Sequence, residues 1–159
     1  SIVDAVVGYN QARKIAMGDR VIAAMGGSVA GAKIAILGLA FKPETDDMRD
    51  SPSLDIIDAL TKAGAVLRAY DPKAMEEACH LLPQDVTFCD SATDCLNGTD
   101  AAVIVTEWNE FRNLDFARMK KIMKTPILVD LRNIYEPEQV AATGLSYRCV
   151  GRPMPETAI

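Results

Sequence analysis

The chain has 159 residues, of which 49% are hydrophobic and 25% charged, as is typical of a globular protein with enough residues for one domain and a core of its own. Its formal net charge of −5 argues against nucleic-acid binding, because contacts with phosphate backbones need clustered lysine and arginine. No apolar run approaches the roughly 18 residues of a membrane span, and no signal peptide is evident.

The first predicted element is a long helix over residues 2–25, which ends at Gly26-Gly27-Ser28. Apolar residues recur in it at roughly helical spacing, with polar residues between them. We interpret this helix as a connecting helix that joins or pairs larger units. The alternative is a helix that lies on the sheet. Because the chain starts with serine rather than methionine, and in a helical pattern, we expect it to be a piece of a longer protein.

Strands and helices alternate after this helix. Strands are predicted over 33–39, 65–70, 86–89, 101–106, 126–131 and 145–149, and helices over 52–63, 73–81, 91–97, 114–123 and 137–142. Such alternation with short links predicts the α/β class, with a doubly wound parallel sheet covered by helices on both faces. The residues from Gly151 onward, which include two prolines, are expected to be loose.

One connection is about twice as long as the 2 to 6 residues that usually join a strand to a helix. It runs from Gly38 to Ser53 and contains Lys42, Arg49, four acids and two prolines. It lacks the GxGxxG pattern that lets a backbone approach a pyrophosphate, so a cationic side chain would have to hold an anion there. Lysine suits phosphate as a point charge, and arginine can make a bidentate contact.

The alternative for this connection is that its cations only neutralise its own acids. Lys42 and Arg49 would then pair with carboxylates of the same stretch, namely Asp46, Asp47 and Asp50. The pattern of residues leaves both interpretations open.

Polar residues also follow three other predicted strands, where ligands bind in such sheets. Asp71 could hold a ribose hydroxyl, or it could start a turn together with the next residue, Pro72. Trp108, in the segment Thr106-Glu107-Trp108, could stack on a ring or lie in the core. Arg132, which follows Asp130, could contact a ligand or pair with a nearby acid.

Catalytic and metal-binding patterns are not evident in the sequence. The four cysteines form no CxxC pair, and His80 is the single histidine, so we expect free thiols in a reducing cytoplasm and no metal site. No GxSxG motif occurs. The residues alone therefore predict a doubly wound domain that binds an anion or a nucleotide and has no catalytic machinery of its own.

The Gly38–Ser53 stretch resembles the signature of the C-terminal, UDP-binding domain of nucleotide-sugar dehydrogenases. Three later blocks fall in the order and spacing of the UDP-glucose 6-dehydrogenases of the UDP-glucose/GDP-mannose dehydrogenase family: Tyr70-Asp71-Pro72, the block from Val103 to Phe111, and the block from Asp130 to Tyr135. The resemblance extends over residues 2 to 153.

The resemblance implies a Rossmann-like fold and a division of the chain. Residues 1–27 would be the end of a central connecting and dimerisation helix, 28–153 the UDP-binding domain, and 154–159 a loose tail. Enzymes of this kind oxidise UDP-glucose to UDP-glucuronate with two NAD+, through a thioester on a cysteine. Their NAD-binding domain and nucleophile lie outside this chain. The expected partners are therefore UDP-glucose, the missing N-terminal domain and a second subunit, and the chain alone is expected to be inactive.

The resemblance also implies roles for single residues. Phe41, Lys42 and Arg132 would contact the nucleotide sugar, and Arg49 would reach NAD. Leu131 stands where the family motif has glycine. Two alternatives remain: the same domain of an enzyme acting on GDP-mannose or a UDP-N-acetyl sugar, and a non-catalytic module for nucleotide binding or dimerisation.

Overall fold

The computed structural model describes residues 16–149. Its centre is a sheet of six parallel strands in the order β3-β2-β1-β4-β5-β6, which is the order of Rossmann-like sheets. The strands are β1 (Lys33–Leu37), β2 (Val66–Tyr70), β3 (Thr87–Phe88), β4 (Ala101–Ile104), β5 (Ile127–Asp130) and β6 (Ser146–Cys149). The predicted doubly wound parallel sheet is therefore confirmed.

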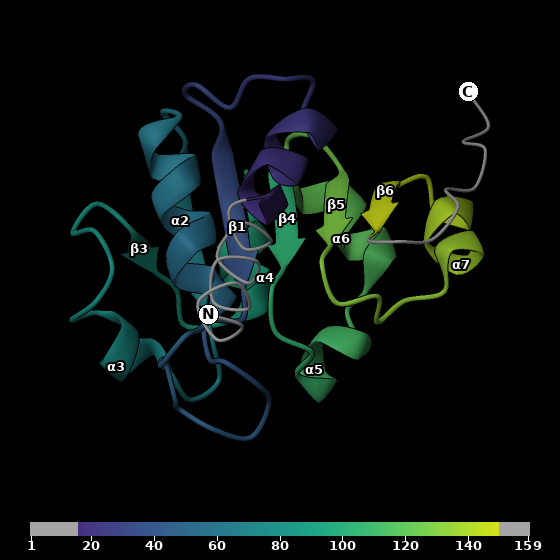
Figure 1. Cartoon of the computed structure of the whole chain (residues 1–159). Coiled ribbons are helices and arrows are strands. Elements are labelled where there is room, and N and C mark those ends of the chain that lie inside the picture. Colours follow the sequence, from purple (N-terminus) through teal and green to yellow (C-terminus); the bar gives the residue numbers. More distant parts are fainter. Residues whose placement is uncertain (1–15, 150–159) are drawn as a thin grey trace, which may run out of the picture.

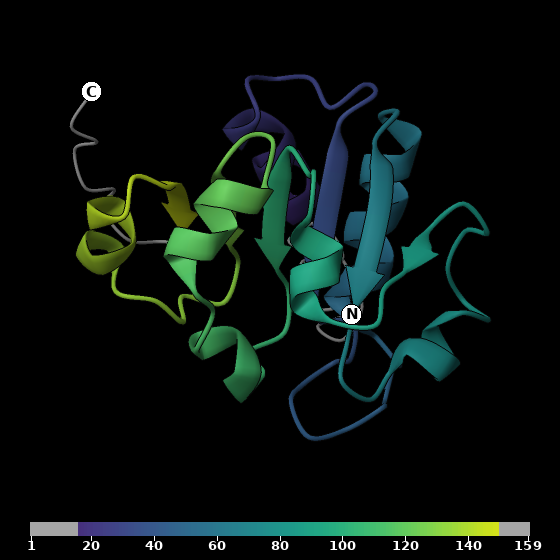
Figure 2. The same ribbon diagram turned by 180° about the vertical axis from the view of Figure 1, so that it is seen from behind.

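Helices cover both faces of this sheet (Figures 1 and 2). α2 (Pro52–Lys62) and a helix over residues 16–24 lie on one face, and α4 (Ala92–Leu96) and α6 (Phe116–Ile122) on the other. The remaining helices are α3 (Met75–Ala78), α5 (Asn109–Arg112) and α7 (Pro137–Ala142).

Two apolar clusters hold these layers together. Along β1, Ile34 and Ile36 belong to the cluster under α2, whereas Ala35 and Leu37 belong to the cluster under α4 and α6. Successive strand residues point to opposite faces, so a strand that is apolar at each of these positions must be covered on both sides. The buried central strands therefore hold their carboxyl ends in fixed relative positions.

The predicted strands and helices are all present from residue 33 onward, and most are shorter at their ends. β1 ends at Leu37 rather than at residue 39, because Gly38 takes φ +96° and turns the chain out of the sheet. The helix predicted over 73–81 is reduced to the four residues of α3. The sequence did not predict α5, a helix of only four residues.

The long helix predicted over residues 2–25 is described only over residues 16–24, so the helix that the structure shows is short. Val21 on it is fully buried in the cluster under α2. The described segment therefore lies on the sheet, which was the alternative interpretation. Residues 2–15 and the predicted tail lie outside the described residues. Among the helices of residues 16–149, none is both long and apolar enough to cross a membrane.

Candidate functional site

The strand order reverses between β1 and β4, which lie side by side at the centre of the sheet. The connection after β1 and the segment that leads from β4 to α5 emerge at the same end of the sheet (Figure 1). Parallel α/β sheets bind ligands outside the carboxyl ends of the strands at such a reversal. The charged stretch found in the sequence therefore lies where the topology favours a ligand.

The base of this stretch is fixed by Asp71, which is fully buried at the end of β2. Its Oδ2 accepts hydrogen bonds from the backbone N–H groups of Leu39 and Ala40, at 2.7 and 3.0 Å, and from Trp108 Nε1 at 3.1 Å. Its Oδ1 accepts two more, from the N–H groups of Lys73 and Ala74, both at 2.8 Å. One carboxylate thus ties the loop after β1 to the segments after β2 and β4.

The carbonyl groups at the base are fixed as well. The hydroxyls of Ser51 and Ser53 both donate to Leu39 O, at 2.6 and 2.7 Å, and the hydroxyl of Thr106 donates to Ala40 O at 2.7 Å. These three hydroxyl-bearing residues are buried. The loop therefore leaves the sheet and returns to α2 between anchored ends.

The tip of the loop is exposed. The N–H of Phe41 donates to Asp47 O at 2.8 Å and closes the tip, while the Phe41 side chain remains 46% exposed. Lys42 is exposed and makes no ion pair with any described residue. Glu44 and Asp50 both take positive φ, at 64° and 55°, which is uncommon for residues other than glycine. An aromatic ring and a cation without an ion pair to any described residue thus stand on a constrained turn.

Arg49 differs from Lys42 because it is paired within the loop. Its Nε and NH2 donate to the two carboxylate oxygens of Asp47, at 3.0 and 3.1 Å. This side-chain bond holds the pKa of Asp47 below its usual value and that of Arg49 above it. The interpretation that the loop cations pair with their own acids therefore holds for Arg49, whereas Lys42 forms no ion pair within residues 16–149 and acts on Asp47 only through its charge. The Arg49 side chain is nevertheless 89% exposed.

The alternatives left open for Asp71 and Trp108 are decided by burial. Both carboxylate oxygens of Asp71 are engaged by five N–H donors, which supports the turn and helix-start interpretation over a contact with ribose. Trp108 is 4% exposed and packs in the core, so its ring is not presented to a ligand. Both residues are buried and support the loop, and neither is placed to contact a ligand.

A second buried carboxylate organises the end of β5. Asp130 accepts hydrogen bonds from the N–H groups of Arg132 at 3.0 Å and Ile134 at 2.8 Å, and from the Tyr147 hydroxyl at 2.6 Å. Arg132 also pairs with Glu107, which follows β4. The predicted ion pair with a nearby acid is therefore present, and it joins two adjacent strand ends.

Leu131, at the glycine position of the family motif, does not have positive φ; the positive value in this segment belongs to Asn133, at 56°. Asparagine tolerates this conformation better than most residues do. The leucine is 5% exposed and packs in the core. Replacement of glycine by leucine is thus compatible with the backbone that presents Arg132.

A further contact that the sequence did not predict closes the side of the site next to β2. The Tyr70 hydroxyl donates to Glu110 Oε1 at 2.8 Å, and partial burial together with this carboxylate raises the pKa of Tyr70 to about 12. The tyrosine therefore keeps its proton at neutral pH and joins β2 to α5. A tyrosine at a strand end gives no sequence signal for a partner 40 residues away.

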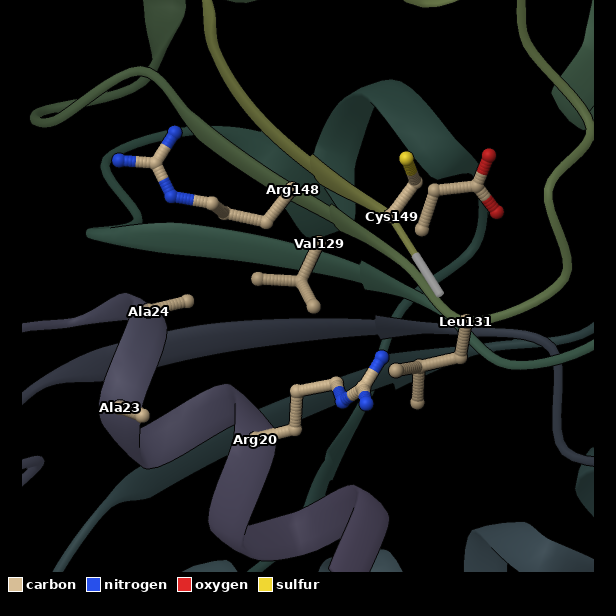
Figure 3. A pocket seen from close by; sticks show the side chains of 8 residues that line it. Arg20, Ala23, Ala24, Val129, Leu131, Arg148 and Cys149 are labelled. Carbon is tan, nitrogen blue, oxygen red and sulfur yellow. The ribbon is translucent and has the colours of Figure 1, made fainter. Parts of the chain in front are cut away.

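Two of the cavities near the strand ends are large enough, or placed well enough, to compare with the loop. An open one of about 680 Å³ lies beside the loop and is lined mainly by Thr45–Asp50, Leu54 and Leu81. The other, of about 300 Å³, lies between helix 16–24 and the β5–β6 edge, and Figure 3 shows Arg20 and Arg148 at its wall. The two guanidinium groups do not converge: Arg20 extends toward Leu131 and Arg148 extends away from it. The second cavity is therefore not arranged as an anion site.

Within residues 16–149, no cluster of three or more histidine, cysteine, aspartate or glutamate side chains is placed to hold a metal ion. Among the described residues, the arrangement at the strand ends instead offers one lysine without an ion pair, one exposed ring and two arginines held by carboxylates. These groups suit an anionic ligand with a ring system.

Comparison with known proteins gives consistent matches. Residues 35–137 match the UDP binding domain of the UDP-glucose/GDP-mannose dehydrogenase family. The chain is 52% identical to UDP-glucose 6-dehydrogenase of Rhizobium meliloti, over 96% of this chain and 35% of that protein. It is 38% identical to the UDP-glucose 6-dehydrogenase TuaD of Bacillus subtilis, over 96% of this chain and 33% of that protein.

Solved structures agree with these matches. A UDP-glucose dehydrogenase from Pyrobaculum islandicum superposes with a TM-score of 0.68 at 27% identity, over 92% of this chain and 30% of that one. UDP-D-ManNAc dehydrogenase from Pyrococcus horikoshii superposes with the same TM-score at 29% identity, over 89% of this chain and 31% of that one. The chain thus spans about a third of the length of the curated relatives described above.

Proposed function

The chain belongs to the UDP-glucose/GDP-mannose dehydrogenase family, to its UDP-binding domain, and on this premise we propose that it is the nucleotide-sugar-binding part of an NAD-dependent UDP-glucose 6-dehydrogenase. The whole enzyme would oxidise UDP-glucose to UDP-glucuronate with two NAD+. The partner domain that holds NAD and the cysteine nucleophile would lie outside this chain, and the full protein would be a homodimer.

The observation that carries this proposal is the contrast within the loop after β1. Its base is fixed by hydrogen bonds to Asp71, Ser51, Ser53 and Thr106, whereas Phe41 and Lys42 at its tip are exposed. A loop that served only to connect β1 with α2 would not need anchors on two neighbouring strands. A fixed base lowers the entropy that the tip loses on binding a ligand. We therefore assign Phe41 and Lys42 to the UDP-sugar.

Arg132 is assigned to the same ligand. Its pairing with Glu107 orients the guanidinium at the end of β5, where it is still 31% exposed. A guanidinium has five N–H donors, so one acid partner does not exhaust it. The remaining donors can contact the phosphates or hydroxyls of a nucleotide sugar.

Arg49 fits the role of a contact with NAD held by the partner domain. Asp47 engages its Nε and NH2 and so fixes the plane of the guanidinium, while the side chain stays 89% exposed. A guanidinium has five N–H donors, so donors remain for a contact across a domain boundary. When bound, NAD accepts the hydride from the substrate; the part assigned to this chain is to position and neutralise, not to react.

Lys42→Ala is expected to weaken UDP binding by roughly 1.5–3 kcal/mol, the scale of a hydrogen bond to a charged group. The reason is that Lys42 forms no ion pair within residues 16–149, so its removal takes away the proposed phosphate contact while Asp47 keeps Arg49 as its partner. Isothermal titration calorimetry with UDP, and with GDP for comparison, measures the change. We expect UDP to bind more tightly than GDP.

Lys62→Ala is the matched control, because this exposed lysine pairs with Asp58 on α2. It should leave UDP affinity unchanged. Equal binding of UDP and GDP, or an affinity that does not respond to Lys42→Ala, would contradict the assignment. A panel of UDP-glucose, UDP-N-acetyl sugars and GDP-mannose distinguishes the enzyme proposed here from its siblings.

The chain by itself is expected to form no NADH from UDP-glucose and NAD+, with or without added thiol. Its sequence has no GxGxxG pattern, and the proposed nucleophile lies in the partner domain. Absorbance at the NADH band checks this, with the full-length R. meliloti enzyme as the positive control. Turnover by the chain alone would show that the catalytic groups lie within it.

A further inference from the structure

Two buried cysteines lie on the same side of the sheet although they come from different elements. Cys89 follows β3 and is 3% exposed, and Cys95 lies on α4 and is fully buried in the same apolar cluster. Cys89 N–H donates to Ala69 O at 2.9 Å, which extends the β2–β3 pairing by one residue. The Cys95 thiol interacts with the Cys89 sulfur and lowers the pKa of Cys89.

Arg68 on β2 faces this pair. In the parallel pairing it lies opposite Thr87, and Cys89, two residues farther on, points to the same face of the sheet. Its guanidinium donates to the carbonyl oxygens of Asp94 and Asn97 at the end of α4, at 2.8 and 3.1 Å. These bonds hold the arginine between the sheet and α4.

The Arg68 Nε is the one buried side-chain nitrogen or oxygen of residues 16–149 without a hydrogen-bond partner. The Arg68 guanidinium also interacts with the Cys89 side chain, and this interaction raises the pKa of Arg68. A sulfur that carries negative charge would satisfy this donor. A buried N–H without a partner, on the guanidinium that interacts with Cys89, thus favours a thiolate at Cys89.

We propose that Cys89 and Cys95 form a redox-active dithiol, which hydrogen peroxide oxidises to an intramolecular disulfide. Cys89 supplies the thiolate, Arg68 stabilises it, and Cys95 is the resolving thiol. This site lies under α4, away from the loop tip, and it is independent of the nucleotide-binding function proposed above.

Neighbouring groups shift the pKa values of the Cys89 and Cys95 thiols in opposite directions. A hydrogen bond from Cys95 and the Arg68 guanidinium lower the pKa of Cys89 to about 6, against the opposing effects of burial and of Asp94. The same hydrogen bond and deeper burial raise the pKa of Cys95. At neutral pH the Cys89 sulfur is the nucleophile, and Cys95 keeps its proton until it attacks the sulfenic sulfur.

The reaction has two balanced steps. The Cys89 thiolate attacks one peroxide oxygen, the O–O bond breaks, and sulfenic acid and hydroxide form. The Cys95 sulfur then attacks the sulfenic sulfur, its proton leaves with the hydroxyl group as water, and the S–S bond forms. Two thiols and one peroxide give one disulfide and two waters, and a cellular thiol can reverse the change.

The test exposes the reduced chain to hydrogen peroxide at pH 7, blocks the remaining thiols with N-ethylmaleimide and maps the products by mass spectrometry. Cleavage before Asp85, Asp90 and Asp94 places Cys79, Cys89 and Cys95 on separate peptides. We expect a Cys89–Cys95 disulfide, formed about tenfold faster than Cys79 oxidises, although Cys79 is the exposed thiol.

Variants test each role. Arg68→Met should slow the loss of the Cys89 thiol about tenfold, because the thiolate fraction at pH 7 falls. Cys95→Ser should leave a sulfenic acid at Cys89 that dimedone traps, with no disulfide, and Cys79→Ser should change nothing. Since Arg68→Met can disturb packing, circular dichroism accompanies it, and the two serine variants test the proposal independently.

Oxidation of Cys79 ahead of Cys89 would overturn the proposal. A disulfide that joins any other pair of cysteines would overturn it as well, and so would a Cys95→Ser chain in which dimedone captures nothing.

Discussion

Asp71→Asn is expected to lower the free energy of unfolding by at least about 3 kcal/mol, measured by urea denaturation of the 159-residue chain. The two oxygens of Asp71 accept five N–H donors in a fully buried position. An asparagine of the same shape offers one acceptor oxygen and turns an NH2 group toward the remaining donors. Two or three buried N–H groups would lose their partner, at about 1–3 kcal/mol each.

Trp108→Phe is the partial control, because it removes a single donor, the Nε1–H that lies 3.1 Å from Asp71 Oδ2. It leaves the four backbone donors in place and should cost less than half as much. If Asp71 instead served to bind ribose, Asp71→Asn would weaken nucleotide binding and leave unfolding within about 0.5 kcal/mol of the parent. That pattern would reject the structural role.

The sequence was sufficient to predict the sheet and the place of the site. Alternating apolar strands and helices permit one economical arrangement, a parallel sheet covered on both faces, and parallel strands bring their carboxyl ends to one edge. Length and charge then distinguished the stretch from Gly38 to Ser53 among the connections. These inferences needed only local pattern and general rules of topology.

Contacts between distant segments could not be predicted in the same way. The five donors of Asp71 come from three segments, and the Arg132–Glu107 pair joins residues 25 positions apart. An acid at a strand end has the same sequence signal whether it holds a ligand or the backbone of its own chain. Only the burial of Asp71 and the count of its donors decided between the two interpretations.

The constrained backbone positions cluster at the site. Apart from glycine, positive φ occurs in the described residues at Glu44, Asp50 and Asn133, and all three lie in the segments that carry Lys42, Arg49 and Arg132. Such conformations cost of order 1–3 kcal/mol each and persist when surrounding contacts fix them. Here the buried carboxylates and hydroxyls at the base supply those contacts. The positive φ values lower the stability of the fold, and they place the cations at the site.

Gly38→Ala tests that arrangement where the loop begins, and we expect a loss of about 3 kcal/mol of unfolding free energy together with loss of UDP binding. Gly38 has φ +96°, and a Cβ there would lie 2.5 Å from Thr106 Cβ and 2.6 Å from Thr106 N. The backbone nitrogen cannot rotate away as a side chain could. Relief therefore requires separation of the ends of β1 and β4, which would break the bond from Thr106 to Ala40 O.

Gly98→Ala is the matched control because Gly98 has φ +74° and nothing within 4 Å of an added Cβ. It carries the conformational cost of a side chain at positive φ without the steric clash, so it should cost about 1 kcal/mol and leave UDP binding intact. The difference of about 2 kcal/mol between the two variants measures the close approach of β1 to the segment after β4. Equal losses in both variants would show that backbone conformation alone requires glycine at position 38, and that the loop does not depend on contact with Thr106.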